Sequence, residues 1–256
     1  MPTLQRKHWI ALGVIAYLLF MLVRLPARVL AGTLARNGVV TGELTGTLWR
    51  GQAQQLQAGV LNLGKVAWQW RALPLFAGQL AADIQITQDN GHAEARVALS
   101  LNGTLTVTQL NASLPLQSLV GSGGLPGGWI GKAQARFSDL SFKNNWPVSA
   151  HGELDVLDLT GPARTPNNLG SYHLSFPVTD NQKSNNEQAL VGALSDRPDA
   201  AIAVTGTLKL EANRNYLLDT MVMARGNAPA DIVQGMQMLG SPDAQGRRPF
   251  SVSGSF

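Results

Sequence analysis

The sequence predicts a mainly β protein, with a single N-terminal transmembrane helix followed by an antiparallel, β-rich domain that contains one or two short helices. Three observations favour this fold class. Residues 9–23 form an apolar run without a charged residue. From residue 39 onwards, short segments alternate apolar with polar residues. Gly, Asn-Gly or Pro separates these segments about every ten residues. The pattern leaves open whether the strands form a meander, a curved sheet or a sandwich.

The apolar run has the composition of a membrane anchor. Arg6 and Arg24 bracket it, and a helix between them spans about 27 Å, close to the roughly 30 Å hydrocarbon core of a bilayer. Its Leu, Ile, Val and Phe side chains favour insertion by roughly 3 to 6 kcal/mol. The alternative is a signal peptide that is cleaved near Ala31. We therefore expect residues 1–8 to be a cytoplasmic stub, 9–25 the anchor, 26–38 a juxtamembrane connector and 39–256 the β-rich domain.

Within the connector, residues 28–37 are expected to continue as a short helix, and the period then changes to two. The alternation is clearest at residues 60–70, where Val66, Trp68 and Trp70 share one face. Asn90-Gly91 and Asn102-Gly103 are predicted hairpin turns. The predicted strands are residues 39–49, 60–70, 80–88, 93–101, 104–114, 133–142, 148–159, 172–178, 201–210, 216–224 and 250–256.

Three segments depart from the strand pattern. Residues 180–199 are polar and predict a loop with a helical turn. Residues 229–239 begin with Pro at a helix start and carry apolar residues at helical spacing. They predict a short helix that caps the sheet, with docking of a partner as the less common alternative. The glycine-rich residues 121–128 predict a connector, and they mark a candidate boundary inside the β-rich domain.

Charge and cysteine content exclude several functions. All 16 acidic residues, but only 15 of the 20 basic residues, follow residue 36. The basic excess therefore belongs to the membrane end, where lipid headgroups attract it, and it does not predict nucleic-acid binding. The chain has no cysteine, which excludes disulfides, thiolate catalysis and cysteine-based zinc sites.

No catalytic, cofactor-binding or metal-binding residues are predicted. His8, His92, His151 and His173 do not show the paired spacing of metal ligands. The glycine-rich stretch lacks the Gly-Lys-Ser/Thr ending of a phosphate-binding loop. No Gly-x-Ser-x-Gly motif occurs. We therefore expect no enzymatic activity and no cofactor.

Four segments resemble the type II secretion system protein N family. They are Leu25-Pro26-Ala27, residues 46–53 (GTLWRGQA), residues 63–80 (LGKVAWQWRALPLFAGQL) and the terminal residues 254–256 (GSF). The resemblance covers the whole chain, and it supplies no catalytic residues. It implies a bitopic, accessory inner-membrane component with a periplasmic β domain. Such a component would contact other parts of the type II secretion system and help to export folded proteins across the outer membrane.

Two alternatives remain open. The glycine- and leucine-rich composition is similar to that of the AsmA-like envelope proteins. This resemblance implies a lipid-binding protein with a curved sheet and an apolar concave face. The alternation of apolar residues with Ser at residues 250–256 would also suit an outer-membrane barrel, if the signal were cleaved near Ala31. The expected partners are thus the inner membrane, other secretion components and, in the first alternative, lipid. The oligomeric state is not specified.

Overall fold

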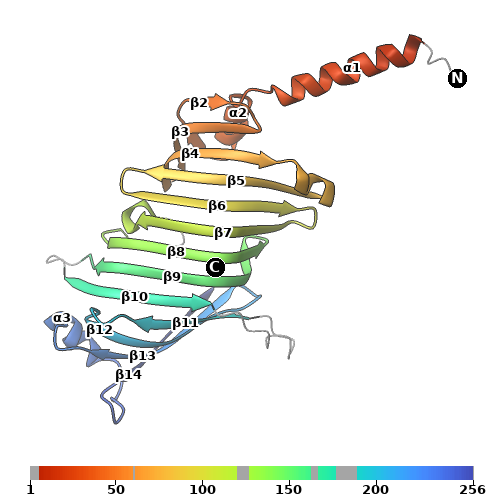
Figure 1. The fold of residues 1–256 in the computed structure, drawn as a ribbon. Helices are drawn as coiled ribbons and strands as arrows, with labels where there is room; N and C mark the ends of the chain where they lie inside the picture. The colour runs from red at the N-terminus through yellow and green to blue at the C-terminus, as the bar shows by residue number, and fades with distance from the viewer. Residues whose placement is uncertain (1–5, 60, 120–126, 163–166, 177–188, 256) are drawn as a thin grey trace.

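A single antiparallel sheet of fourteen strands dominates the structure (Figure 1). The structure, a computed structural model, describes residues 6–59, 61–119, 127–162, 167–176 and 189–255. From β3 to β14 every strand pairs with the next strand in the chain, while β1 and β2 both pair with β3. The predicted mainly β fold is therefore confirmed, and its strands form a meander.

The helices are short except for the first. They are α1 (Arg6–Val23), α2 (Val29–Arg36) and α3 (Ala230–Met236), with 3-10 turns η1 (Leu73–Ala77) and η2 (Leu116–Leu119). The strands are β1 (Val39–Thr41), β2 (Leu44–Gly46), β3 (Arg50–Ala58), β4 (Leu61–Arg71), β5 (Gln79–Gln88), β6 (Gly91–Ser100), β7 (Thr104–Pro115), β8 (Ile130–Lys143), β9 (Trp146–Thr160), β10 (Asn168–Phe176), β11 (Leu190–Asp196), β12 (Ile202–Leu210), β13 (Asn215–Ala224) and β14 (Arg248–Ser255).

Two of the predicted elements need correction, and one strand was missed. Residues 39–49 are not one strand but two strands of three residues, β1 and β2. Strand β3 was not predicted, because its glutamine-rich sequence, RGQAQQLQA, shows little apolar alternation. The loop prediction for residues 180–199 is wrong where β11 forms, and residues 180–188 lie outside the described part of the chain. Most of the candidate boundary at residues 121–128 also lies outside it, so the division into domains stays a prediction.

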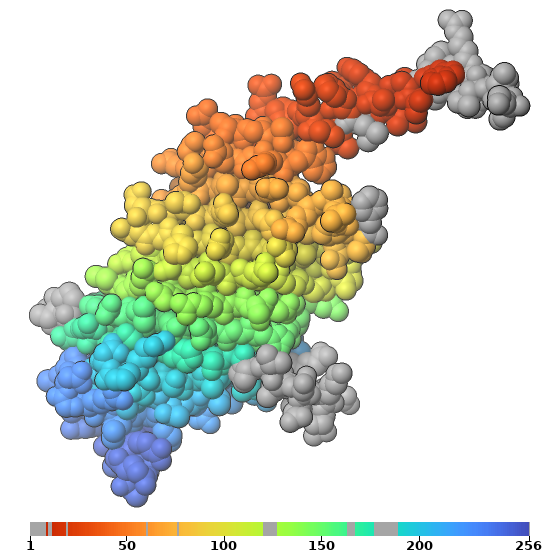
Figure 2. Space-filling view, viewed as in Figure 1, coloured from red at the N-terminus to blue at the C-terminus, as the bar shows by residue number. Residues whose placement is uncertain are grey.

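Helix α1 projects from the N-terminal end of the molecule, away from the sheet (Figures 1 and 2). Apolar side chains along it are exposed, among them Leu12 (55%), Leu18 (57%) and Val23 (62%). In the described part of the chain, no helix reaches the length and hydropathy required of a membrane span.

The strand register gives the sheet one apolar face. Residues that lie directly opposite each other in an antiparallel pair point to the same side. One such row crosses the sheet from β2 to β14, and apart from Thr220 every member is apolar or glycine. Its members are Leu44, Ala53, Val66, Ile86, Ala93, Ala112, Ala135, Leu154, Leu174, Leu194, Gly206, Thr220 and Phe250.

The other face is polar along most of its length. The neighbouring row, one residue away on every strand from β4 to β14, is polar until its last two members, Met221 and Pro249. It comprises Lys65, Thr87, His92, Ser113, Gln134, Asp155, His173, Ser195, Thr205, Met221 and Pro249. A sheet that divides its side chains in this way has one face for water and one that must be covered.

β-bulges keep the apolar residues on one face where the sequence alternation changes phase. On β7, the apolar residues Leu105 and Val107 are odd-numbered, whereas Leu110 and Ala112 are even-numbered. The register shift between β6 and β7 falls at this change, and Gln109 there has a positive φ of 54°. The extra residue in the bulge restores the apolar side chains to the same side.

In the middle of the sheet, the apolar face is covered by the bending of the sheet itself. Phe137 on β8 and Phe176 on β10 are each only 8% exposed. Their ring centroids lie 6.1 Å apart. Gly152 on β9 is the residue opposite both, and with no side chain it lets the two rings meet across its strand.

The turns confirm this bend. Arg214, in the β12–β13 turn, donates a hydrogen bond of 2.9 Å to the carbonyl oxygen of Asn144, in the β8–β9 turn. Four strand spacings separate these turns, which on a flat sheet amounts to about 19 Å. The C-terminal strands therefore curl towards the central ones.

We expect Gly152→Ala to lower the free energy of unfolding by about 1–3 kcal/mol, the usual cost of overpacking a core. A Cβ at this position would lie 2.6 Å from the Cα of Phe137 and 2.8 Å from its ring. Urea unfolding of the detergent-solubilised full chain, followed by circular dichroism, measures the change. Gly226→Ala is the control, because a Cβ at Gly226 meets nothing within 4 Å. Equal stability of the two variants would contradict the packing argument.

Candidate functional site

The histidines that were considered as metal ligands lie on different strands. His92 is on β6, His151 on β9 and His173 on β10. Among the described residues, no group of three or more His, Asp or Glu side chains lies close enough together to hold a metal ion. That the protein has no catalytic, cofactor or metal site stays a prediction.

The structure instead brings together three of the four segments on which the family resemblance rests, whereas Gly254 lies on β14 at the other edge of the sheet. The chain that leaves α1 pairs with the β2–β3 hairpin, and Pro26 forms an isolated antiparallel bridge with Thr47. The Ala27 N–H donates to the Gly46 carbonyl at 3.0 Å, and the Leu48 N–H donates to the Leu25 carbonyl at 2.8 Å. Ala27 is fully buried. We call residues 25–27 and 46–49 the joint, because they connect α1 directly to the sheet.

Gly46 is needed for the tight turn of the joint. Its φ is +87°, in the region that favours glycine. A Cβ at this position would lie 2.5 Å from the carbonyl oxygen of Arg50 and 2.9 Å from the Cα of Gly51. A larger residue would therefore push β2 away from β3 and distort the hairpin with which the chain leaving α1 pairs.

Two tryptophans tie the joint to its surroundings. The Trp49 indole N–H donates a hydrogen bond of 2.8 Å to the carbonyl oxygen of Leu22, in the last turn of α1. Carbonyls at this end of a helix have no partner within the helix, so an external donor stabilises them. The Trp68 indole N–H on β4 donates to the Leu48 carbonyl at 2.9 Å. The helix end, the hairpin and β4 are thus linked through side chains as well as through the backbone.

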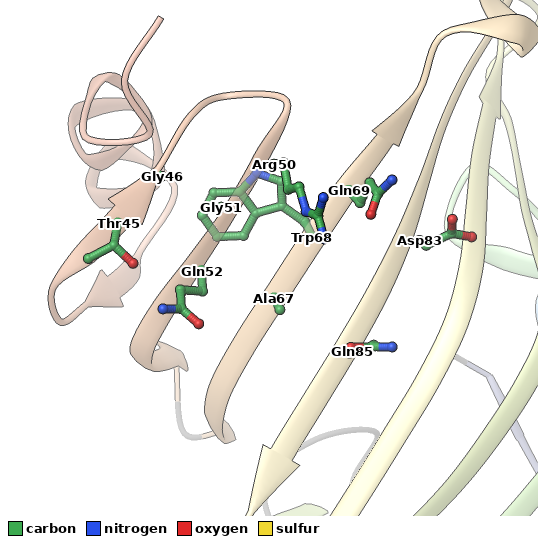
Figure 3. A pocket seen from close by; sticks show the side chains of 10 residues that line it. All are labelled: Thr45, Gly46, Arg50, Gly51, Gln52, Ala67, Trp68, Gln69, Asp83 and Gln85. Carbon is green, nitrogen blue, oxygen red and sulfur yellow. The ribbon is translucent and has the colours of Figure 1, made fainter. Parts of the chain in front are cut away.

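A polar recess of about 460 Å³ lies beside the joint (Figure 3). Arg50, Gln52, Gln69 and Gln85 provide hydrogen-bond donors and acceptors along its lining. Asp83 lines it as well, and it accepts hydrogen bonds from the Nε atoms of Arg71 at 2.7 Å and Arg96 at 3.1 Å. This lining suits the binding of a polar surface.

Asp83 is kept ionised by its two arginines. Burial by itself raises the pKa of the Asp83 carboxyl group, but the hydrogen bonds and charges of Arg71 and Arg96 outweigh burial and hold that pKa below its ordinary value. No pattern in the sequence alone indicates this recess. Arg50 lies in the GTLWRGQA segment of the resemblance, whereas strand pairing alone brings Asp83 and Gln85 next to it.

A second polar cluster lies near the C-terminal end of the sheet. The carboxylate of Asp155, whose side chain is 6% exposed, accepts hydrogen bonds from Arg197 Nη2 at 2.5 Å and from His173 Nδ1 at 2.7 Å. Beside it, the Ser171 hydroxyl donates to Asp199 at 2.7 Å. These contacts connect β9 and β10 with the segment that follows β11, so the cluster holds the curled strands together.

The pKa of Asp155 is affected in the same way as that of Asp83. Burial raises it, but the hydrogen bonds and charges of Arg197 and His173 outweigh burial, and the net pKa lies below the ordinary value. The two partners lie 18 and 42 residues from Asp155 in the chain. No local motif in the sequence indicates this cluster.

We expect Trp49→Phe to loosen the end of α1, since the Leu22 carbonyl loses its indole donor. A lost hydrogen bond of this kind costs about 0.5–1.5 kcal/mol. Limited trypsin digestion of the full chain in detergent should then cleave faster after Arg24 and Arg28. Trp9→Phe is the matched control, because Trp9 lies at the other end of α1 and is 63% exposed. Unchanged cleavage in Trp49→Phe would show that this bond does not hold the joint.

We expect Asp155→Asn to lower the free energy of unfolding by about 1–3 kcal/mol at neutral pH, because hydrogen bonds to a charged group are lost. A depressed folded-state pKa gives stability that is fully present above about pH 4, the unfolded value, and is lost as the pH falls through the folded value. The difference from the unsubstituted chain should therefore shrink below about pH 4. Urea unfolding across a pH series measures it, with the exposed Asp219→Asn as control. A difference that is constant with pH would contradict the assignment.

Comparison with known proteins gives one consistent result. The profile of the family described as "Type II secretion system (T2SS), protein N" matches residues 37–251. The chain is similar to type II secretion system protein N of Aeromonas hydrophila, at 28% identity over 261 residues that cover 95% of this chain and 96% of that protein. It is also similar to type II secretion system protein N of Vibrio cholerae serotype O1, at 24% identity over 236 residues and 91% of each chain. No solved structure matches significantly.

The matched residues include the β2–β3 hairpin, the polar recess and the sheet as far as β14. They account for most of the chain, and the two relatives are matched over nearly their full lengths. The chain belongs to the type II secretion system protein N family.

Proposed function

We propose that the protein is a bitopic inner-membrane accessory component of the type II secretion system. In this proposal α1 is the membrane anchor, the residues before it are cytoplasmic and the sheet is periplasmic. Membership of the family supports the assignment to the secretion system. The observation that carries the proposal is the joint, which connects an exposed apolar helix to the first strands of the sheet through backbone and indole hydrogen bonds.

The character of α1 supports an anchor. Its 18 residues span about 27 Å as a helix. Its apolar side chains are exposed rather than packed on the sheet, as expected if lipid surrounds them. At its C-terminal end, the Arg24 guanidinium lies 4.7 Å from the centroid of the Phe20 ring. Such a charge can lie at the level of the lipid headgroups while its stem remains in apolar surroundings.

In this proposal the joint determines which strands of the sheet lie near the membrane. It holds β1, β2 and β3 close to the membrane surface, and the later strands extend away from it in chain order. Fourteen strands would reach about 60 Å if they were flat, and the curl at β10–β14 shortens this reach. Confinement to the membrane raises the effective concentration of the polar face for other secretion components. The protein acts in this proposal by contact, without a catalytic step.

The polar recess is the place where we propose a secretion component to dock. It lies next to the joint, so its position relative to the membrane is the most closely defined on the sheet. It presents Arg50, Gln52 and Gln69, whose side chains can bond to a partner's backbone and polar side chains.

A second candidate function is lipid binding, and the apolar row favours it. The apolar face continues from the joint to β14 without a charged residue in that row. Towards the N-terminal half it is partly open, with Leu80 47% and Leu99 44% exposed. Water-exposed apolar surface of this extent on one face of a protein usually marks an interaction with another apolar molecule.

The anchor proposal is tested by placing charge in α1. Arg at the centre of a membrane helix costs about 2.5–3.5 kcal/mol, so the double variant Ile15→Arg, Leu18→Arg should cancel the predicted insertion energy. We expect the variant protein to be lost from the membrane fraction. In a deletion strain that carries only this variant, exoproteins should accumulate in the periplasm. The unsubstituted protein should restore the release of exoproteins in the same strain. Protease access in spheroplasts should digest the sheet from the periplasmic side.

The control is Ile15→Leu, Leu18→Ile, which keeps the helix apolar and should restore release fully. Normal exoprotein release in the deletion strain would contradict a role in secretion. Release supported by the double-Arg variant would contradict the need for an anchor and leave the secretion role intact.

A further inference from the structure

A cavity of about 440 Å³ lies between α3 and strands β9–β14, on the apolar face of the sheet. We propose that this cavity binds one fatty acyl chain of a lipid. The inference rests on the second candidate function, lipid binding, and it names both the place and the part of the lipid that is bound.

The cavity lining is mainly apolar on both sides, and Asp231 at the start of α3 is its one charged member among the described residues. From the helix side it receives Ile232, Met236 and Leu239, and from the sheet Leu194, Val204, Leu218, Val222 and Phe250. Met236 is 8% exposed and Val222 is 7% exposed. Walls of this composition favour an apolar ligand. Its volume lies within the range of about 300–1,000 Å³ that is usual for ligand pockets.

The hydroxyl groups of the lining are already satisfied by the fold. The Tyr172 hydroxyl donates to the Leu169 carbonyl at 3.0 Å. The Thr220 hydroxyl donates to the Phe250 carbonyl at 2.9 Å. A buried peptide segment would leave its own polar groups unpaired here, at about 1–3 kcal/mol each. A hydrocarbon chain has no such groups, and for this reason we favour an acyl chain over a polypeptide.

The cavity also continues the apolar row of the sheet. Leu194, Thr220 and Phe250 belong both to that row and to the cavity lining. The apolar row therefore leads into the cavity lining without a charged residue in that row, and α3 lies over the face at this point.

The helix α3 leaves a gap at Gly235. This residue lines the cavity, and a Cβ placed on it meets nothing within 4 Å. The segment after α3 is held down by Arg248, whose guanidinium donates to the Gly240 carbonyl. The covering segment is thus fixed at its end, while space remains beside Gly235. A side chain added there would occupy that space without displacing the backbone.

The experiment uses the full chain in lipid nanodiscs and two photoreactive probes. One is palmitic acid with a diazirine near its methyl end, and the other is a phosphatidylethanolamine with the same group on one acyl chain. After illumination, tryptic peptides are mapped by mass spectrometry. We expect adducts on residues 226–247, which contain α3, and on residues 202–222. Adducts from either probe support the proposal, and the probe that reacts identifies free fatty acid or phospholipid as the source.

The decisive variant is Gly235→Leu, which fills the space beside α3. We expect its cavity adducts to fall about tenfold, the equivalent of 1.4 kcal/mol of binding free energy. Gln234→Leu is the matched control, because it adds the same side chain to the same helix at an exposed position outside the lining. Thermal unfolding verifies that both variants fold. If Gly235→Leu does not fold, Ile232→Gln replaces it, since a polar group in the lining should also reduce labelling.

The outcomes separate the inference from the function on which it rests. Adducts that are confined to α1, or cavity adducts that Gly235→Leu leaves unchanged, overturn the inference. If native mass spectrometry detects retained lipid but no adduct forms in the cavity, the inference is wrong and the second candidate function stands. No retained lipid and no adducts would overturn both. The role in secretion is measured separately by exoprotein release, and none of these outcomes decides it.

Discussion

Every feature of this structure depends on the register of a single-layered sheet. Because side chains alternate along a strand, pairing in one continuous register places Val66, Ala135 and Leu194 on the same face, although these residues lie on β4, β8 and β11. A slip of one residue at any hairpin would transfer all later apolar residues to the polar face. The bulge at Gln109 maintains this division of the faces, because it compensates for a change in the apolar–polar alternation of the sequence.

A sheet with one apolar face and no second layer must cover that face in another way. Two solutions occur along this chain, and a third stretch of the face stays open. In the middle, the sheet bends so that Phe137 and Phe176 meet across Gly152. At the C-terminal end, α3 covers the face but leaves a cavity. Towards the N-terminal end, Leu80 and Leu99 stay largely exposed. The degree of cover therefore differs from one part of the face to another.

The two ends of the sheet are suited to different kinds of contact. The polar recess lies at the first strands, beside the joint, where Trp49 and the backbone of residues 25–27 hold α1 to the sheet. The apolar cavity lies at the last strands, which the Asp155 cluster holds in their curled arrangement. The polar recess and the apolar cavity thus lie towards opposite ends of one continuous sheet.

The sequence by itself determined the mainly β fold, most of the strands, the hairpin at Asn102-Gly103 and the helix near residue 230, since each depends on local periodicity or turn chemistry. It also pointed to the family through the segments around Pro26 and Trp49. Tertiary structure alone decided the rest. Strand β3 forms although its glutamine-rich sequence has weak alternation, because β4 supplies its hydrogen-bond partners on one side. Asp155 meets Arg197, and Leu194 meets α3 across a cavity, because strand pairing and the curl of the sheet set these distances, and no local pattern encodes contacts between residues so far apart in the chain.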